Sequence, residues 1–477
     1  MSRDSEEETD VLENVAEVIE GLTKDLQELY QFRDMFFENH PIEMAKEKNK
    51  LVEEKKNALV EKFEAIDVDT QIPFSLRAQF LYMKGRCYNI NPTYDSRATQ
   101  CLSKAVKLNP HLVDAWNELG ECYWKNMNVK DAKASFEGAL KHVGTIFFRL
   151  IYCFILIHLL THFILFLQER NRLSLRCLSI ILRQESGERK LKEASAAILK
   201  SVELAKEAVA QDIKDGVSWT VLGNAYLCQF FMVSQDPVTL KSCMSAYKQA
   251  WMDPVAKGQP DLYYNKGIAL KYEEQYSEAL ENFEYACRLD PPWEPPKQEL
   301  ARLSQYLSSA DELVRTKGKL KGKKLQQMVQ SIDKKMLGVY GPGTFHTFGA
   351  RRDVTLELVR MSELQEGANE GKVILAKVVG SIHSENAVPF TFAVVDESME
   401  CLCVTVYNWA DGRGAIIGDC VCVPEPRLSV HKGEQPRVKY NFKSIRVNNP
   451  MMILVNGKRV GRNQFACTKV TSTYEIH

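Results

Sequence analysis

The side chains best suited to chemistry in this sequence are carboxylates, amides and basic groups that recur at equivalent positions of a repeating pattern. A carboxylate accepts hydrogen bonds from a guanidinium or an α-ammonium group, and an arginine binds a carboxylate through two parallel hydrogen bonds. A short extended peptide with charges of both signs fits such a set. The positions are Tyr82, Arg86, Asp114, Asn117, Glu121, Trp124, Arg183, Asn224, Asp261, Tyr264 and Lys271.

Catalysis is not expected. The sequence has no P-loop, nucleophile elbow, HExxH motif or clustered set of Cys and His ligands, so we expect a binding protein without cofactor or metal. The pairs Cys401/Cys403 and Cys420/Cys422 could be imagined as a metal site. At this spacing each pair shares one face of a strand, whereas zinc knuckles leave two residues between ligands. We interpret all four as buried core thiols, in keeping with a cytosolic or nuclear protein.

Helical hairpins are expected to position the binding residues, because one spacing of large and small residues recurs along the chain. The glycine of each copy lets two helices approach closely, the alanine is their small contact, and the large residues fill the space between hairpins. Copies surround Gly85, Gly120, Trp219 and Gly267, and a degenerate pair covers about 171–212. This is the tetratricopeptide spacing. It predicts a helical solenoid over 71–312, in which the first helix of each pair lines a concave groove.

Different patterns flank the repeats. Residues 1–70 contain amphipathic helices, which we interpret as a cap on the first repeat, with a partner-binding coiled coil as the alternative. Within residues 350–477 the apolar period becomes two, and five short strands predict a small closed barrel of the OB type. The expected fold is therefore a mainly α helical-repeat solenoid followed by a small all-β OB-type barrel. Such barrels can bind single-stranded nucleic acid, although a docking or structural role suits this balanced composition better.

The Lys-rich segment between solenoid and barrel, residues 313–349, is a local exception in a chain of zero net charge. It concentrates cations with no acid among them: Arg315, Lys317, Lys319, Lys321, Lys323 and Lys324. One interpretation is a solvated linker. The other is contact with a polyanion such as RNA, because lysines that neutralise phosphates release counterions.

Residues 144–168 are apolar enough to suggest a membrane span, with no acidic or basic side chain between Arg149 and Glu169. A span here would separate repeats that must stack on one another. The segment also begins where the second helix of a repeat should end. We therefore interpret it as a retained-intron or gene-model insert. A genuine apolar insert that does not span and a real membrane span are the alternatives.

Several motifs together resemble the tetratricopeptide repeat protein 5 family: "LQELYQFRD", "AWNELGECYWK", the lysine run, "VPFTFAVVD", "VYN" and "IGD". The resemblance covers nearly the whole chain outside 144–168. It implies an adaptor that recognises the N-terminal Met-Arg-Glu-type peptide of nascent α- and β-tubulin on the ribosome. Recognition would recruit an mRNA-decay adaptor and trigger decay of the tubulin message. The alternative role is a nuclear stress-responsive scaffold that binds an acetyltransferase coactivator.

The resemblance also assigns residues. The peptide-contacting arginine and aspartate fall on Arg183 and Asp261, and the family's glutamate aligns with Pro295, so that Glu294 could replace it only if the loop shifts. The ribosome-contacting lysines fall on Lys321 and Lys323, with Lys319 and Lys324 beside them. The expected peptide site thus combines Arg183, Asp261, Glu294, Tyr264, Asn224, Asn117 and Glu121. We expect the protein in cytoplasm and nucleus, with no membrane partner.

Overall fold

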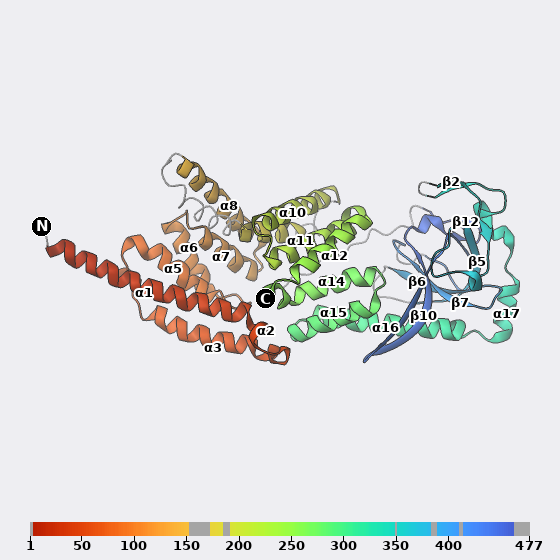
Figure 1. Cartoon of the computed structure of the whole chain (residues 1–477), viewed down its shortest axis with the longest axis horizontal. Helices are drawn as coiled ribbons and strands as arrows, with labels where there is room; N and C mark the ends of the chain where they lie inside the picture. Colours follow the sequence, from red (N-terminus) through yellow and green to blue (C-terminus); the bar gives the residue numbers. More distant parts are fainter. Residues whose placement is uncertain are drawn as a thin grey trace. The chain divides into compact units, whose positions relative to one another are not determined.

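The computed structural model describes residues 3–151, 172–184, 191–348, 351–382, 389–409 and 414–461. The chain divides into two compact units, which are described separately (Figure 1). The helical unit contains the residues up to Glu273 together with Glu281–Pro296. The barrel unit contains Glu274–Leu280 and the residues from Lys297 onward.

The helical unit is built from the hairpins that the repeat spacing predicts. In each, two antiparallel helices pack closely, and the first helix of the next hairpin packs on them. The pairs are α5 (Phe74–Tyr88) with α6 (Ser96–Leu108), α7 (Val113–Lys125) with α8 (Val129–Ile151), residues 172–184 with α10 (Leu191–Gln211), α11 (Gly216–Gln229) with α12 (Pro237–Ala250), and α14 (Pro260–Tyr272) with α15 (Tyr276–Leu289). The short turn α4 (Val68–Gln71) precedes α5, η2 (Phe230–Ser234) connects α11 to α12, α13 (Pro254–Lys257) precedes α14, and α16 (Glu294–Thr316) follows the last pair.

Local sequence explains where these helices begin and how tightly they pack. The carboxylates of Asp95 and Asp236 accept hydrogen bonds from the first backbone N–H groups of α6 and α12, which satisfies donors that the helix itself leaves unpaired. A Cβ on Gly120 would lie 2.6 Å from the ring of Phe136, so only glycine permits this approach of α7 and α8. The spacing of small and large residues is thus a packing requirement.

The hydrophobic core of the repeats is continuous across the apolar segment. Trp124 and Phe136 of the second hairpin share one buried cluster with Cys177 and Ile181 of the next. In addition, the Ser174 hydroxyl donates a 2.6 Å hydrogen bond to the side-chain oxygen of Asn117. The hairpins on either side of the segment therefore stack directly on one another, as a single solenoid requires.

The suspected insert itself is only partly described. Helix α8 continues through Gly144 to Ile151, and residues 152–168 lie outside the described part of the chain. Within the described ranges, no helix is both long and apolar enough to cross a bilayer. The origin of residues 144–168 stays a prediction.

The N-terminal helices pack against the first repeat. Helix α1 (Arg3–Asp34) leads through α2 (Phe36–Asn39) and the 3₁₀ turn η1 (Ile42–Met44) into α3 (Ala45–Glu64). Leu26 of α1 and Phe63 of α3 share a buried cluster with Phe80 and Met83 of α5. The N-terminal segment also reaches the last hairpin, because Glu43 forms a 3.0 Å ion pair with Arg288 of α15.

The barrel unit contains the five strands that the alternating pattern predicts: β5 (Lys372–Ile382), β6 (Phe390–Val395), β7 (Cys401–Val406), β8 (Cys420–Pro424) and β10 (Val438–Val447). Strands β5, β6 and β7 form antiparallel neighbours, and β7 pairs in parallel with β10. The sequence pattern missed β9 (Arg427–Gln435). This strand pairs with β10, while β8 pairs with β5, and only Glu425 and Pro426 separate β8 from β9. One bent strand thus closes the sheet into a barrel.

Shorter elements complete the barrel unit. They are η3 (Lys317–Lys319), α17 (Gly322–Gln330), η4 (Lys334–Tyr340), β1 (His346–Phe348), β2 (Arg351–Val354), β3 (Glu357–Leu358), η5 (Met361–Glu363), β4 (Gly367–Ala368), η6 (Pro450–Met452), β11 (Leu454–Val455) and β12 (Lys458–Arg459). The segment 313–349 therefore contains helical turns and is not an extended linker. Most of α16 also belongs to this unit, because Leu313 packs on the barrel and the Tyr306 hydroxyl lies 3.2 Å from that of Thr391.

The four paired cysteines are buried core thiols, as the strand pattern predicts. Cys401, Cys403, Cys420 and Cys422 are at most 7% exposed. Burial raises the pKa of each thiol, to about 12 for Cys401 and Cys422. They therefore stay protonated at neutral pH and contribute to the barrel as small apolar side chains.

Candidate functional site

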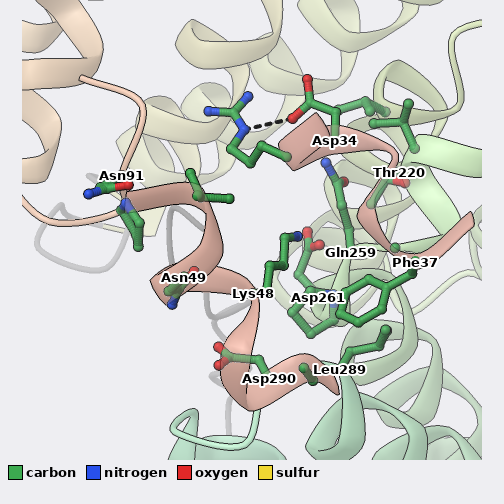
Figure 2. A pocket seen from close by; sticks show the side chains of 18 of the residues that line it. Asp34, Phe37, Lys48, Asn49, Asn91, Thr220, Gln259, Asp261, Leu289 and Asp290 are labelled. Atoms are coloured by element: carbon green, nitrogen blue, oxygen red, sulfur yellow. Dashed lines mark hydrogen bonds and ion pairs between the residues drawn. The ribbon is translucent and has the colours of Figure 1, made fainter. Parts of the chain in front are cut away.

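A pocket of about 240 Å³ lies inside the helical unit, between the N-terminal helices and the inner face of the repeats (Figure 2). One wall comes from the end of α1, from α2 and from α3, with Arg33, Asp34, Phe37 and Lys48. The other wall comes from α7, the residues 172–184, α11, the α13–α14 turn and the end of α15, and includes Trp124, Ile180, Thr220, Asp261 and Asp290. The volume suits one or two side chains of a larger ligand.

Asp261 is the buried carboxylate of the repeat wall. It lies in the first turn of α14, where the positive end of the helix dipole favours an anion, and it is 7% exposed. Burial raises its pKa to about 6, although backbone N–H groups of residues 261 and 262, the charge of Arg183 and a hydrogen bond from Asn224 all favour the ionised form. The Tyr247 hydroxyl in turn donates to Asn224 at 2.7 Å. This network fixes the carboxylate in place at the pocket.

Arg183 lies on the residues 172–184 and is 4% exposed. Its Nη1 donates hydrogen bonds to the hydroxyls of Ser179 at 2.8 Å and Ser201 at 3.0 Å. Its charge acts on Asp261, which places the two residues in one electrostatic environment even though they are 78 positions apart in the sequence. Arg183 is not among the residues that line the pocket, so it supports the site from behind this wall.

The other predicted groove residues occupy three different settings. Asn117 and Asn224 are fully buried and hydrogen-bonded between helices. Tyr264 is 8% exposed and packs on Trp293, with 5.1 Å between ring centroids. Glu294 is exposed at the start of α16, and it does not line the pocket. The structure thus brings together Asp261, Asn224 and Arg183, and it leaves Glu294 outside this group.

Glu121 belongs to a second charged network in the same groove. Burial and the neighbouring Glu118 raise the pKa of its carboxyl, whereas Lys125, Arg33 and Arg86 oppose the rise. Glu118 forms a 3.1 Å ion pair with Arg86. Acidic and basic side chains therefore lie close together on this part of the inner face, Glu118 with Arg86 and Glu121 near Lys125.

The repeat spacing could not reveal the N-terminal wall. Arg33, Asp34 and Lys48 precede the first hairpin. No local pattern marks them, because they reach the pocket only when the N-terminal helices lie along the repeats. Arg33 Nε donates a 2.7 Å hydrogen bond to the Asp34 carboxylate, drawn as a dashed line in Figure 2.

The Lys-rich segment presents its cations from a fixed turn. Lys317 donates a 2.8 Å hydrogen bond to the carbonyl of Met399, and Gly318 has φ +69° where a Cβ would lie 2.1 Å from the Val379 carbonyl oxygen. Lys319 is exposed and pairs with Glu312 at 2.9 Å. The remaining three lysines are exposed and form no ion pair with any residue that the structure describes: Lys321, Lys323 and Lys324.

The outer face of β6 and β7 is the surface that binds single strands in many OB barrels. Here Ala393, Val395 and Cys401 pack against Leu325 and Val329 of α17 and are at most 7% exposed. The chain's own helices therefore cover this face. A nucleic-acid strand could bind there only after α17 had left, which argues against an RNA-binding barrel.

Known proteins match this combination of repeats and barrel. A family model described as Tetratricopeptide repeat protein 5 OB fold domain matches residues 355–469, and a Tetratricopeptide repeat model matches residues 260–292. Tetratricopeptide repeat protein 5 from Homo sapiens is 39% identical over 461 residues, covering 96% of this chain and 98% of its own length. The Mus musculus protein is 40% identical over 476 residues and covers 99% of both chains. The chain belongs to the tetratricopeptide repeat protein 5 family.

Solved structures show likeness to the helical part. The tetratricopeptide protein YrrB, whose structure is described as having an unusual peptide-binding site, is 17% identical with a TM-score of 0.30 and covers 50% of this chain and 98% of its own. The Assembly Chaperone of RpL4 is 11% identical with a TM-score of 0.37, over 56% of this chain and 97% of its own. Repeat proteins of the tetratricopeptide type typically serve as scaffolds or adaptors rather than enzymes.

Proposed function

We propose that this member of the tetratricopeptide repeat protein 5 family is a non-enzymatic adaptor for nascent tubulin. Its pocket would bind the N-terminal Met-Arg-Glu-type peptide on the ribosome, and the complex would recruit an mRNA-decay adaptor to the tubulin message. The observation that carries the proposal is the buried, ionisable carboxylate of Asp261 at the wall of the pocket, with Arg183 close enough to act on its pKa. A guanidinium or α-ammonium group bound there gains a charge-assisted hydrogen bond away from water.

The exposed lysines support a ribosome contact in the cytoplasm. Lys321 precedes the first turn of α17, and Lys323 and Lys324 lie within it. Cations at a helix N-terminus are unfavourable, because the N–H groups there already carry partial positive charge. Phosphate groups are attracted both by those N–H groups and by the lysines. This arrangement therefore costs stability in the free protein and favours binding to ribosomal RNA.

The proposal is tested by titrating a peptide with the N-terminal sequence of tubulin into the full-length protein. Calorimetry is expected to show saturable one-to-one binding, while a peptide of the same composition in scrambled order binds at least about tenfold more weakly. Equal affinity for both peptides, or no binding of either, contradicts the proposed ligand.

Charge reversal at Lys321 and Lys323, each to Glu, is expected to abolish co-sedimentation with translating ribosomes. Each lost phosphate contact weakens binding, and each new carboxylate is repelled by the RNA backbone. The peptide titration should be unchanged, because neither residue belongs to the helical unit. A matched control is charge reversal at the exposed Lys104 and Lys107 of α6. Unchanged sedimentation of the Lys321/Lys323 variant would contradict the ribosome contact.

The Lys321/Lys323 variant also distinguishes the ribosome-bound adaptor from the alternative function, a nuclear stress-responsive scaffold for an acetyltransferase coactivator. That role needs neither the pocket nor the lysines, so coactivator binding by the variant should equal that of the wild type. Loss of ribosome binding with retained coactivator binding is the outcome expected if both roles exist.

A further inference from the structure

Lys48 is the cationic side chain that α3 contributes to the pocket. It is half-buried, and Figure 2 shows it extending from α3 into the pocket between Asp34 and Asp290. Its Nζ lies 4.9 Å from the centroid of the Phe37 ring, which also lines the pocket. The aromatic ring fixes the direction of the side chain and shields it from solvent.

The ammonium group of Lys48 lacks a direct polar partner. It forms no hydrogen bond and no ion pair within 4.0 Å with any residue in the described parts of the chain. The charged groups around it are Arg33, Asp34 and Asp290, and all three act on it only through space. Asp34 is already bonded to Arg33 Nε at 2.7 Å. Removing an ammonium from water without a partner costs free energy, so this position is unfavourable in the empty pocket.

A structural role does not account for this placement. A long apolar side chain such as Met could pack on Phe37 without the cost of desolvating a charge. A lysine at the surface keeps its hydration. Lys50, on the same helix, has a side chain that is 79% exposed, and its Nζ lies 3.9 Å from Oε1 of Glu54. The position of Lys48 is therefore better explained by a ligand that supplies the missing anion.

We propose that Lys48 binds a carboxylate of the peptide ligand, so that the pocket recognises a cation at Asp261 on one wall and an anion at Lys48 on the other. This inference rests on the proposed function, because it takes the pocket as the peptide site. In this proposal the acidic residue of the ligand contacts the N-terminal wall of the pocket. Arg183 attracts the same residue only over a longer distance. Arg183 is bonded to two serines and lies behind the pocket wall.

Because Lys48 can lose its proton, binding of a carboxylate at this subsite should depend on pH. Burial, followed by the repulsion of Arg33, lowers the pKa of Lys48 to about 8, although Asp34 and Asp290 act in the opposite direction. A carboxylate bound at Lys48 would raise this pKa, because it stabilises the charged form. Peptide affinity is therefore expected to fall as the pH rises above about 8, where the free protein loses the ammonium proton.

The experiment combines Lys48→Met with two peptides that differ only at the acidic residue, Glu or Gln. In the wild type, Glu→Gln in the peptide should weaken binding at least about tenfold, and Lys48→Met should weaken binding of the Glu peptide to the same degree. In the Lys48→Met protein the two peptides should bind almost equally, since a double-mutant cycle isolates the pairwise interaction. Lys50→Met is the control and should leave both affinities unchanged.

The outcomes separate the inference from the function on which it rests. If the wild type binds the Glu peptide but Lys48→Met binds it equally well, or still prefers Glu to Gln by the wild-type ratio, the Lys48 subsite is wrong and the proposed function stands. If the wild type fails to bind the peptide, both are wrong. Thermal unfolding of the Lys48→Met protein should show an unchanged or higher midpoint, which confirms that any loss of binding is not a loss of fold.

Discussion

Replacing Asp261 with Asn is expected to lower the affinity for the tubulin N-terminal peptide about 100-fold, the largest effect of any single substitution in the pocket. Removing one partner of a buried charge pair costs about 2–5 kcal/mol, and about 1.4 kcal/mol corresponds to a factor of ten. The Asn side chain has nearly the same shape and can still accept the hydrogen bond from Asn224. The loss would therefore report on charge alone, measured by calorimetric titration at pH 7.

The pH dependence provides a second signature of Asp261. Its pKa of about 6 in the free protein means that the carboxyl is ionised at pH 7 and gains a proton below pH 6. Because a cationic ligand binds the ionised form, affinity should fall about tenfold for each pH unit below 6. The measurement is best made between pH 5 and 7, above the ordinary pKa of the peptide glutamate at about 4.3. The Asp261→Asn protein should show no such fall.

Stability should not fall in this variant. The folded pKa of Asp261 lies above the unfolded value, so the folded state binds more protons between about pH 4 and 6. The protonated carboxyl of Asp261 therefore stabilises the folded state at low pH, and this contribution is lost as the pH rises through 6. Asn does not ionise, so the Asp261→Asn protein does not undergo this loss. Asp95→Asn, which keeps a capping side chain at α6, is the control. An unaltered peptide affinity in Asp261→Asn would remove Asp261 from the site.

Replacing Arg183 with Ala is expected to reduce both binding and the free energy of unfolding. The substitution removes the donor to Ser179 and Ser201 and leaves a cavity behind the pocket wall. Each buried polar group left without its partner costs about 1–3 kcal/mol, so for the two hydroxyls we expect a total loss of about 2–6 kcal/mol in denaturant unfolding. This loss is expected because the Arg183 side chain is only 4% exposed.

The effect of Arg183 on binding can be separated from its effect on stability. Without the charge of Arg183, the pKa of Asp261 should rise further. The loss of peptide affinity at acidic pH should therefore begin at a pH above 6. Arg176 lies on the same helix as Arg183 and forms a 2.8 Å ion pair with Asp215, which precedes α11. Arg176→Ala should lower stability without moving the pH at which affinity falls. An Arg183→Ala protein with wild-type stability and no shift in that pH would contradict the electrostatic link to Asp261.

Local pattern was sufficient for most of the architecture, because repeat spacing and strand alternation are set by contacts between near neighbours. Gly120, Phe136 and their counterparts must recur for two helices to pack, so they are visible in the sequence. The strands β5 to β8 are visible as short runs of apolar residues buried on both faces, and β10 is visible as alternating buried and exposed residues. Strand β9 was missed because polar residues and Gly433 occupy most of its positions, with His431 at one of the two buried ones, which leaves little apolar alternation to detect.

Counting positions from the repeat motif selected Asp261 and Asn224 as inward-facing, and the structure joins them by a hydrogen bond. The count could not distinguish a side chain that faces the pocket from one sealed between helices. Asn117, Asn224 and Tyr264 are of the second kind. That distinction depends on how far neighbouring hairpins rotate against one another, which no single repeat encodes.

The sequence by itself determined the repeat solenoid, the barrel, the buried thiols and the inward positions of Asp261 and Asn224, since each follows from contacts within a hairpin or between adjacent strands. Only the tertiary structure decided that α1 to α3 form a second wall, that Lys48 and Asp34 enter the pocket with it, and that α17 covers the outer face of β6 and β7. These features join segments far apart in the chain. They depend on the sum of many weak packing contacts, which leaves no short pattern to read.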